Sequence, residues 1–251
     1  MYFSYNLLAL VACAALFPML LTRAAPPETG TAPRLRPKLA WEKSPLGAIG
    51  VVVSGITGAA FRMIGPVYGL AVGLEANRIA LFLSAYVVGG ALAHIPTGWL
   101  ADKYDRRFVL IGISVAAILG CGAMQAGAQG NIVTIFLAAG FFGFTTMPIY
   151  SIATAHAHDF AQQNERVELS AAHMFLYAVG AIASPVVASA LIATFGPGAM
   201  FALIALSHVA LIVFGLWRIR IRPAPESRTR YVHAPRTSFI IGRLTRKGRE
   251  R

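Results

Sequence analysis

Five charged residues gather within six positions of this sequence, from Asp102 to Arg107, and long apolar runs lie on both sides. A charged segment this short cannot lie in hydrocarbon, so we expect a tight loop at a membrane surface. Asp102 and Arg106 are four residues apart and can form an ion pair if the preceding helix continues by one turn. Gly98 lies on the same helical face as Asp102, where a missing side chain lets another helix approach closely.

Arg62 is a charged residue about seventeen positions into another apolar run. A charge near the centre of a membrane span costs about 2.5–3.5 kcal/mol on insertion scales, so it should face a cavity or a partner. One hypothesis is that Arg62 contacts an anionic substrate or a counter-carboxylate. The other is that it extends to the outer interface, with Tyr68 nearby. Both residues are therefore candidates for contacts with a substrate.

Histidines supply the remaining candidate chemistry. His94 lies in an apolar run before the charged loop, where histidine can serve proton coupling, although a hydrogen-bonded packing role is the alternative. His156, His158 and Asp159 have the composition of a metal cluster, but positions 156 and 158 face different sides of a helix, and we expect no metal site. His173 is expected near the cytoplasmic start of the following run.

The sequence shows no chemistry typical of an enzyme. It has no nucleophile motif, no phosphate-binding or dinucleotide-binding glycine pattern and no paired carboxylates within the apolar runs, so we expect neither catalysis nor a cofactor. Cys13 and Cys121 both lie in apolar runs and give no disulfide framework. The basic tail has too few aromatic residues for a nucleic-acid platform, so nucleic acid is not an expected partner.

Composition places these residues in an all-α integral membrane protein. Of 251 residues, 57% are hydrophobic and 13% are charged, and the mean hydropathy is +0.64. No soluble domain of this size needs so much apolar sequence. With an apolar run at 1–22, about seven transmembrane helices are expected, the other six at 45–72, 78–101, 107–128, 131–154, 168–195 and 199–218.

Charge and proline divide the chain into four parts. Residues 1–22 are expected to form a membrane helix rather than a signal peptide, because the apolar run has no Lys or Arg at its start, where a signal peptide has a basic segment. Residues 23–44 combine prolines with basic residues, so we expect a linker without a stable helix or strand. A six-helix bundle follows at 45–218. The basic segment 219–251 is expected to be a disordered tail attracted to anionic lipid.

The positive residues orient these parts in the membrane. Alternation of the spans puts the linker, two loops and the tail on one side, and these hold 20 of the 22 Lys and Arg residues. Positive residues concentrate on the cytoplasmic side of membrane proteins, so the linker and the tail are expected there. The net charge of +12 thus suits a membrane surface.

The stretch Gly98–Leu110 resembles the signature loop of the major facilitator superfamily, G-x-L-A-D-R-x-G-R-R-x-x-L. Lys103 stands where Arg is usual, and Asp105 stands where a glycine would allow a tight turn. The matching positions are Gly98, Leu100, Ala101, Asp102, Arg106, Arg107 and Leu110.

The resemblance implies that this loop latches the cytoplasmic side of a carrier that faces outward. In such a latch, Asp102 would interact with the N-terminal end of the fifth span of the unit. Gly98, Arg106 and Arg107 would belong to the same gating motif. An ordinary basic loop that orients two helices is the alternative.

Members of the superfamily usually have two six-helix halves with the substrate between them. Residues 1–22 look like the sixth helix, 23–44 like the central connection and 45–218 like the C-terminal half. The stretch Pro148–Asp159 resembles the tenth helix and following loop of bacterial carriers of this superfamily.

These likenesses imply a secondary active transporter of a small molecule that works by alternating access in a bacterial inner membrane. A missing N-terminal half, another chain or a second copy would complete it. The alternative is a non-transporting membrane fragment or scaffold that associates with another membrane chain.

Two glycine patterns predict close helix packing, which we expect within the half. Gly65, Gly69 and Gly73 recur at a spacing of four on one face of the first span after the linker. Gly140 and Gly143 lie in the fourth span.

Overall fold

The computed structural model describes residues 2–21 and 34–221, and these ranges contain helices and no strand. The chain divides into two compact units, Met1–Arg34 and Leu35–Arg251. The first unit contains α1 (Tyr2–Leu20), a helix without charged residues. The helix expected within residues 1–22 is therefore present, and its crossing of a membrane stays a prediction.

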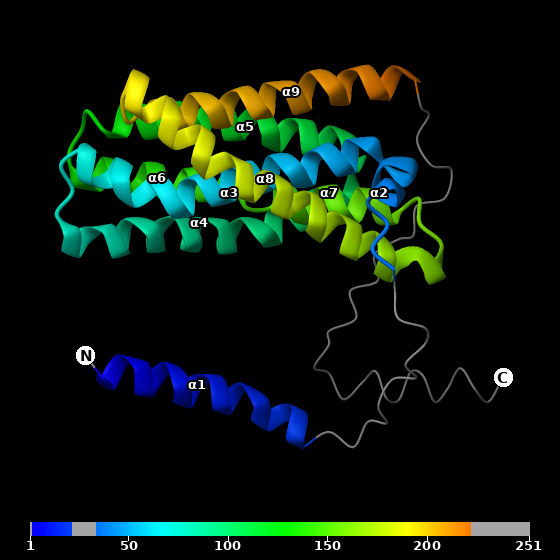
Figure 1. Cartoon of the computed structure of the whole chain (residues 1–251), viewed down its shortest axis with the longest axis horizontal. Coiled ribbons are helices and arrows are strands. Elements are labelled where there is room, and N and C mark those ends of the chain that lie inside the picture. Colours follow the sequence, from blue (N-terminus) through cyan, green and yellow to red (C-terminus); the bar gives the residue numbers. More distant parts are fainter. Residues whose placement is uncertain (1, 22–33, 222–251) are drawn as a thin grey trace. The chain divides into compact units, whose positions relative to one another are not determined.

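The second unit is a bundle of helices that run side by side along its long axis (Figure 1). Among the described residues, six helical segments are long and apolar enough to cross a membrane, which confirms the all-α membrane fold. The fourth of these segments consists of two helices, with a break at Met147 and Pro148. The elements are α2 (Pro37–Lys43), α3 (Pro45–Ala71), α4 (Ala76–Lys103), α5 (Arg106–Gly127), α6 (Ile132–Thr146), α7 (Ile149–His158), the short 3-10 helix η1 (Gln163–Glu165), α8 (Arg166–Phe195) and α9 (Ala199–Ile221).

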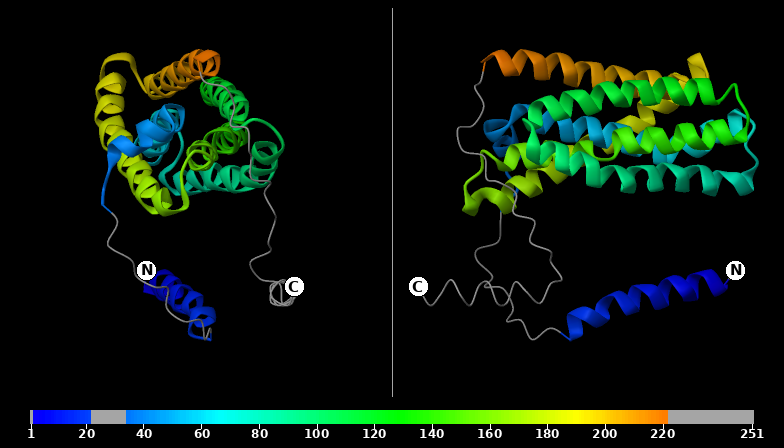
Figure 2. Two further views of the ribbon diagram at one scale, coloured as in Figure 1. Left: turned by 90° about the vertical axis from the view of Figure 1, so that its right-hand side faces the viewer. Right: turned by 180° about the vertical axis from the view of Figure 1, so that it is seen from behind.

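Helix α3 is the central helix of the bundle. It packs against α7, α8 and α9, while α4 and α5 both pack against α6, and the end-on view in Figure 2 shows this arrangement. A Cβ atom at Gly55 would lie 2.2 Å from the carbonyl oxygen of Tyr177, and one at Gly180 would lie 2.3 Å from that of Val52. Helices α3 and α8 therefore touch backbone to backbone, as small residues allow in membrane helices.

The predicted glycine packing is confirmed at Gly143 in the fourth span and is wrong at Gly140 and in the first span. A Cβ atom at Gly143 would lie 1.9 Å from a carbonyl oxygen of α4, so this glycine is required for the contact. At Gly65 and Gly69 an added Cβ would make only ordinary contacts of 3.4–3.9 Å. Gly73 has a φ of +89° and serves the turn after α3 instead.

The expectation that residues 23–44 contain no helix is wrong for α2. Pro37 occupies the first turn of α2, where a missing N–H has no consequence. Leu39 and Ala40 are buried against α3, α7 and α8, so packing stabilises a helix that composition disfavours. The first three residues of the tail expected at 219–251 are helical and belong to α9, while residues 22–33 and 222–251 lie outside the described residues.

The two ends of the bundle differ in what holds them together. The aromatic end packs rings from four helices, namely Phe61, Tyr68, Phe82, Phe142 and Phe201. The charged end comprises α2, the loop between α4 and α5, the end of α7, and η1. There, ion pairs join Lys43 to Glu165 and Arg36 to Glu168.

Candidate functional site

Arg62 lies at an open cavity lined by residues from five helices, which we call the central cavity. Its volume is about 410 Å³. Helices α3, α4, α6, α7 and α8 all contribute to its wall. The lining residues are Ser54, Gly58, Arg62, Tyr86, His94, Thr146, Met147, Tyr150, Ser151, Met174 and Tyr177.

The close contact of α3 with α8 positions the guanidinium. Arg62 Nη2 donates a hydrogen bond of 2.5 Å to the hydroxyl oxygen of Tyr177. Gly58 lies one turn earlier on α3, and a Cβ atom there would be 3.2 Å from Arg62 Nη2 and 3.3 Å from the Tyr177 hydroxyl. A side chain at position 58 would therefore crowd both groups. The glycine leaves room for the arginine to lie along its own helix and meet α8.

The electrostatics of the central cavity favour an anion. Among the described residues that line it, no side chain is acidic and Arg62 carries the only permanent charge. Hydroxyl groups of Tyr86, Thr146 and Tyr150 can orient a ligand by hydrogen bonds. Of the two hypotheses for Arg62, this geometry agrees with the one in which it faces a cavity, because its partner is Tyr177 on a wall of that cavity.

His94 joins the central cavity to a second, larger one. This loop cavity has a volume of about 820 Å³ and includes Gly98, Asp102 and Arg106. His94 and Ser151 line both cavities. Most of the candidate residues from the sequence therefore line these two joined cavities. Arg62 and His94 line the central cavity, and Gly98, Asp102 and Arg106 line the loop cavity towards the charged end.

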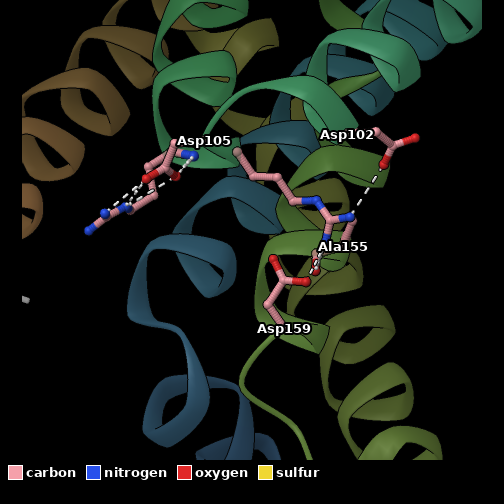
Figure 3. A network of polar contacts seen from close by, with 6 residues as sticks. Asp102, Asp105, Ala155 and Asp159 are labelled. Carbon is pink, nitrogen blue, oxygen red and sulfur yellow. Dashed lines mark hydrogen bonds and ion pairs between the residues drawn. The ribbon is translucent and has the colours of Figure 1, made fainter. Parts of the chain in front are cut away.

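Arg106 is the centre of a network that joins three segments. Its guanidinium donates a hydrogen bond of 3.0 Å to the carbonyl oxygen of Ala155, forms a short ion pair with Asp159 and forms a longer one of 3.4 Å with Asp102. Figure 3 shows these three acceptors around one guanidinium. The pair predicted from the spacing of Asp102 and Arg106 is present, because α4 continues to Lys103. The expected contact of Asp102 with the start of α8 is not among the hydrogen bonds and ion pairs of the described residues.

Asp105 makes the turn before α5 without a glycine. Its φ is −63°, which any residue adopts, and its carboxylate accepts a hydrogen bond of 3.0 Å from the backbone N–H of Arg107. The same carboxylate pairs with the Arg107 guanidinium at 2.9 Å. Asp105 is thus an N-cap of α5. Asp105 and Arg107 thus pair between the loop and the first turn of α5.

Tyr68 is not part of the cavity. Its side chain is 1% exposed, and its hydroxyl donates a hydrogen bond of 2.8 Å to the carbonyl oxygen of Met124 on α5. A tyrosine that satisfies its hydroxyl in the aromatic core cannot contact a ligand at Arg62. The prediction that Tyr68 contacts a substrate is therefore wrong for this structure.

Sequence reasoning missed Tyr177 and the role of Asp159. Tyr177 lies on α8, far from Arg62 in sequence, and only the glycine contact between α3 and α8 brings them together. Asp159 was considered for metal binding, and among the described residues no group of three metal-binding side chains is found. Its position after the fourth span, on the same side of the membrane as the basic loop, is the signal that could have predicted the ion pair with Arg106.

Comparison with known proteins places this bundle in context. The sequence model of the Major Facilitator Superfamily matches residues 47–249. An uncharacterized MFS-type transporter of Enterobacter sp. (strain 638) is 28% identical over 223 residues, which are 88% of this chain and 56% of that protein. The uncharacterized MFS-type transporter YcaD of Salmonella heidelberg (strain SL476) is 28% identical over 194 residues, 76% of this chain and 50% of that protein. The chain spans about half the length of the curated relatives it matches.

Proposed function

The chain belongs to the major facilitator superfamily, and on this premise we propose that it is the C-terminal half of a secondary active transporter for a small anionic molecule. The observation that carries this proposal is Arg62, held in a membrane span by Tyr177 beside a cavity without acidic lining. The cavity wall supplies one charge and several hydroxyl groups for the ligand. The other wall of a complete site would come from an N-terminal half, another chain or a second copy.

Transport would proceed by alternating access. The two halves of such a carrier rock about a site near the middle of the membrane, so the ligand meets one side of the membrane at a time. The loop cavity continues from His94 towards the charged end and supports a path for the ligand on that side. Arg106 would hold the closed arrangement through Asp102 and Asp159, and Gly98 leaves space for an approaching helix, since nothing lies within 4 Å of its Cβ position.

The orientation that we propose follows from the positive residues. Residues 35–43 of the basic linker and the loop at Lys103 to Arg107 lie with the charged end, which we place in the cytoplasm of a bacterial cell with an inner membrane. In this arrangement α1 is the sixth helix of the carrier and the linker 23–44 is the central connection. The tail 219–251 would then meet anionic lipid on the cytoplasmic face.

A ligand-binding experiment on the full chain tests the role of Arg62. The purified chain in lipid nanodiscs is heated with small organic anions or with neutral amides of matched size. A ligand at 100 times its Kd stabilises the folded state by about 2.7 kcal/mol. We expect at least one anion to raise the unfolding temperature of the wild type and of Arg78→Gln, but not of Arg62→Gln. Arg78 is the matched control, because it is an exposed arginine paired with Glu75.

If the same anion stabilised Arg62→Gln as much as the wild type, Arg62 would not be a binding residue for it. Stabilisation by neutral compounds alone would overturn the assignment of an anionic ligand. An anion that binds is then tested for exchange in proteoliposomes. Binding without exchange would favour the alternative function, a non-transporting membrane chain that associates with another chain.

A further inference from the structure

His173 is a buried titratable residue that the substrate site does not use. It is the eighth residue of α8, its side chain is 0% exposed, and neither ring nitrogen has a hydrogen-bond partner among the described residues. A buried polar group without a partner costs about 1–3 kcal/mol. An imidazole with two such nitrogens inside a membrane span therefore indicates a ligand for them.

The neighbours of His173 form a line along the contact between α7 and α8. The ring of His158 lies 6.4 Å from that of His173, edge to face, and its Nε2 lies 3.2 Å from the hydroxyl oxygen of Ser170. Two turns further into the membrane, the rings of Tyr150 and Tyr177 are 5.5 Å apart. The end of α7 thus meets the start of α8, and the start of α7 meets a later turn of α8, as antiparallel helices require.

Thr154 falls between the two contacts. It lies four residues after Tyr150 and four before His158, on the same helical face. Its hydroxyl is also buried without a partner among the described residues. We call this line the polar seam. It consists of Tyr150, Thr154 and His158 on α7 and of Ser170, His173 and Tyr177 on α8.

The polar seam connects the central cavity with the charged end. At its inner end, the Tyr177 hydroxyl accepts the hydrogen bond from Arg62. At its outer end, His158 is the last residue of α7 and is only partly buried. The six polar side chains of the seam thus lie between the central cavity and the charged end.

The charges around the seam are few. The negative charge of Asp159 favours the protonated form of His158, and the positive charge of Arg166 disfavours it. From α2, Lys43 is paired with Glu165. The segment before α2 adds Arg36, which pairs with Glu168.

The other helices packed against α8 bring few titratable groups. The only charged residue of α3 is Arg62. On α9, His208 bonds to Thr57 at 3.2 Å, and Arg218 and Arg220 lie in the last turn. On α7, His156 packs its ring against Phe160. Histidine is the side chain whose ordinary pKa lies nearest to neutral, so the candidate proton-binding groups of the seam are its two histidines.

We propose that His173 and His158 form a proton-binding site that connects the central cavity to the charged end. The proton comes from hydronium at the outer end. An N–H bond forms on the imidazole of His158, an O–H bond of the hydronium breaks and water remains. Transfer to His173 forms an N–H bond there and returns His158 to neutral, so charge and atoms balance.

This proposal rests on the proposed function and names the coupling ion. A proton on His173 places a positive charge one helical turn from Tyr177, close to the ligand that Arg62 would bind. An anion and a proton then bind cooperatively, because each stabilises the other and the coupling is reciprocal. The carrier would move an anion together with a proton.

Histidine NMR on the full chain in lipid nanodiscs tests the site without any ligand. The chain has six histidines, and single His→Gln variants assign their ring nitrogen signals. The measurements are the change of each signal between pH 4 and pH 8 and the transfer of magnetisation from water to each ring. His208 is the matched control, because it is also 0% exposed and its Nδ1 has no partner among the described residues.

We expect His158 and His173 to respond to pH and to contact water, while His208 does neither. In His158→Gln, the pH at which His173 responds should move by about one unit, because a charge that close interacts strongly in a protein interior. The proposal would be overturned if the His173 signal, like that of His208, neither changed with pH nor received magnetisation from water. It would also be overturned if the pH dependence of His173 were the same in His158→Gln as in the wild type. Neither result depends on the anion experiment with Arg62→Gln, so failures of the two proposals are distinguishable.

Discussion

The aromatic end and the charged end of the bundle are held by different forces. At the aromatic end, Phe61 is 0% exposed, and its ring lies 4.4 Å from that of Tyr86 and 5.1 Å from that of Phe142. At the charged end, Arg106 joins α4 and α5 to α7 through ion pairs beside an open cavity.

Ring packing and ion pairing differ in how easily a rearrangement can replace them. Dispersion contacts between close-packed rings are lost as soon as the rings separate, because nothing else fills the space. Partly exposed ion pairs can exchange partners with water or with another charged segment at little cost. The aromatic end therefore suits a fixed pivot, and the charged end suits a part that opens and closes.

The largest effect is expected where α4 meets α6, next to the aromatic rings. An alanine at position 143 would place its Cβ 1.9 Å from a backbone oxygen, and no side chain can move to relieve this clash. Gly143→Ala should therefore cost more than the 1–3 kcal/mol of ordinary overpacking and reduce the yield of folded, monodisperse protein. Gly140→Ala is the matched control, since its nearest contact is at 3.6 Å. Equal yields for both variants would show that the helices separate easily.

The next effect is the loss of a ring from the aromatic end. Phe61→Ala should lower the free energy of unfolding by about 3–5 kcal/mol, because it removes contacts with four other rings. Cys121 lies buried in the same cluster and reacts with a thiol dye only when this end opens. Labelling on heating, in a Cys13→Ala background, measures the change. Phe108→Ala is the control, because Phe108 is 57% exposed.

A smaller and local effect is expected at the charged end. Arg106→Gln removes hydrogen bonds to charged groups worth about 1.5–3 kcal/mol. The rate of amide hydrogen exchange should rise in residues 149–158, which Arg106 contacts, and stay unchanged in residues 132–146, which pack against the aromatic rings. Lys103→Gln is the control, since Lys103 contacts the rings of Trp99 and Tyr104 in its own segment. Equal exchange changes in both ranges would mean that the ends are not independent.

These expectations also separate what the sequence predicts from what needs the structure. Hydropathy predicted the spans to within a few residues, because a membrane forces helices of one length and composition. The spacing of Asp102 and Arg106 also predicted their ion pair, which forms because α4 continues past Asp102 to Lys103 and α5 begins at Arg106. The sequence did not predict which side chains of different helices contact each other. The sequence identifies Arg62 as a charge within a membrane span but does not identify its partner Tyr177, because the register of α3 against α8 depends on backbone contact at Gly55 and Gly180.

Three predictions from the sequence fail for the same reason. Tyr68 and the glycines of the first span were assigned from their place on one helix, without knowledge of which neighbour that face meets. The short helix α2 was missed because its composition disfavours a helix, while burial of Leu39 and Ala40 stabilises it. Tertiary packing decided each of these cases, and one sequence does not reveal it.

The smallest effect concerns the turn between α4 and α5. Asp105→Gly restores the residue usual in the family signature and removes both the cap of α5 and the pair with Arg107. Replacement of an N-cap by glycine costs only a few tenths of a kcal/mol, and loss of the pair adds to this cost because Arg107 is buried. Because φ is negative at this position, the turn itself needs no glycine. Asp105→Asn keeps the cap and loses the charge, so thermal unfolding of the two variants separates the contributions. A stability gain in Asp105→Gly would mean that the turn is strained with aspartate, and that the charged end is held more tightly by its backbone than by its ion pairs.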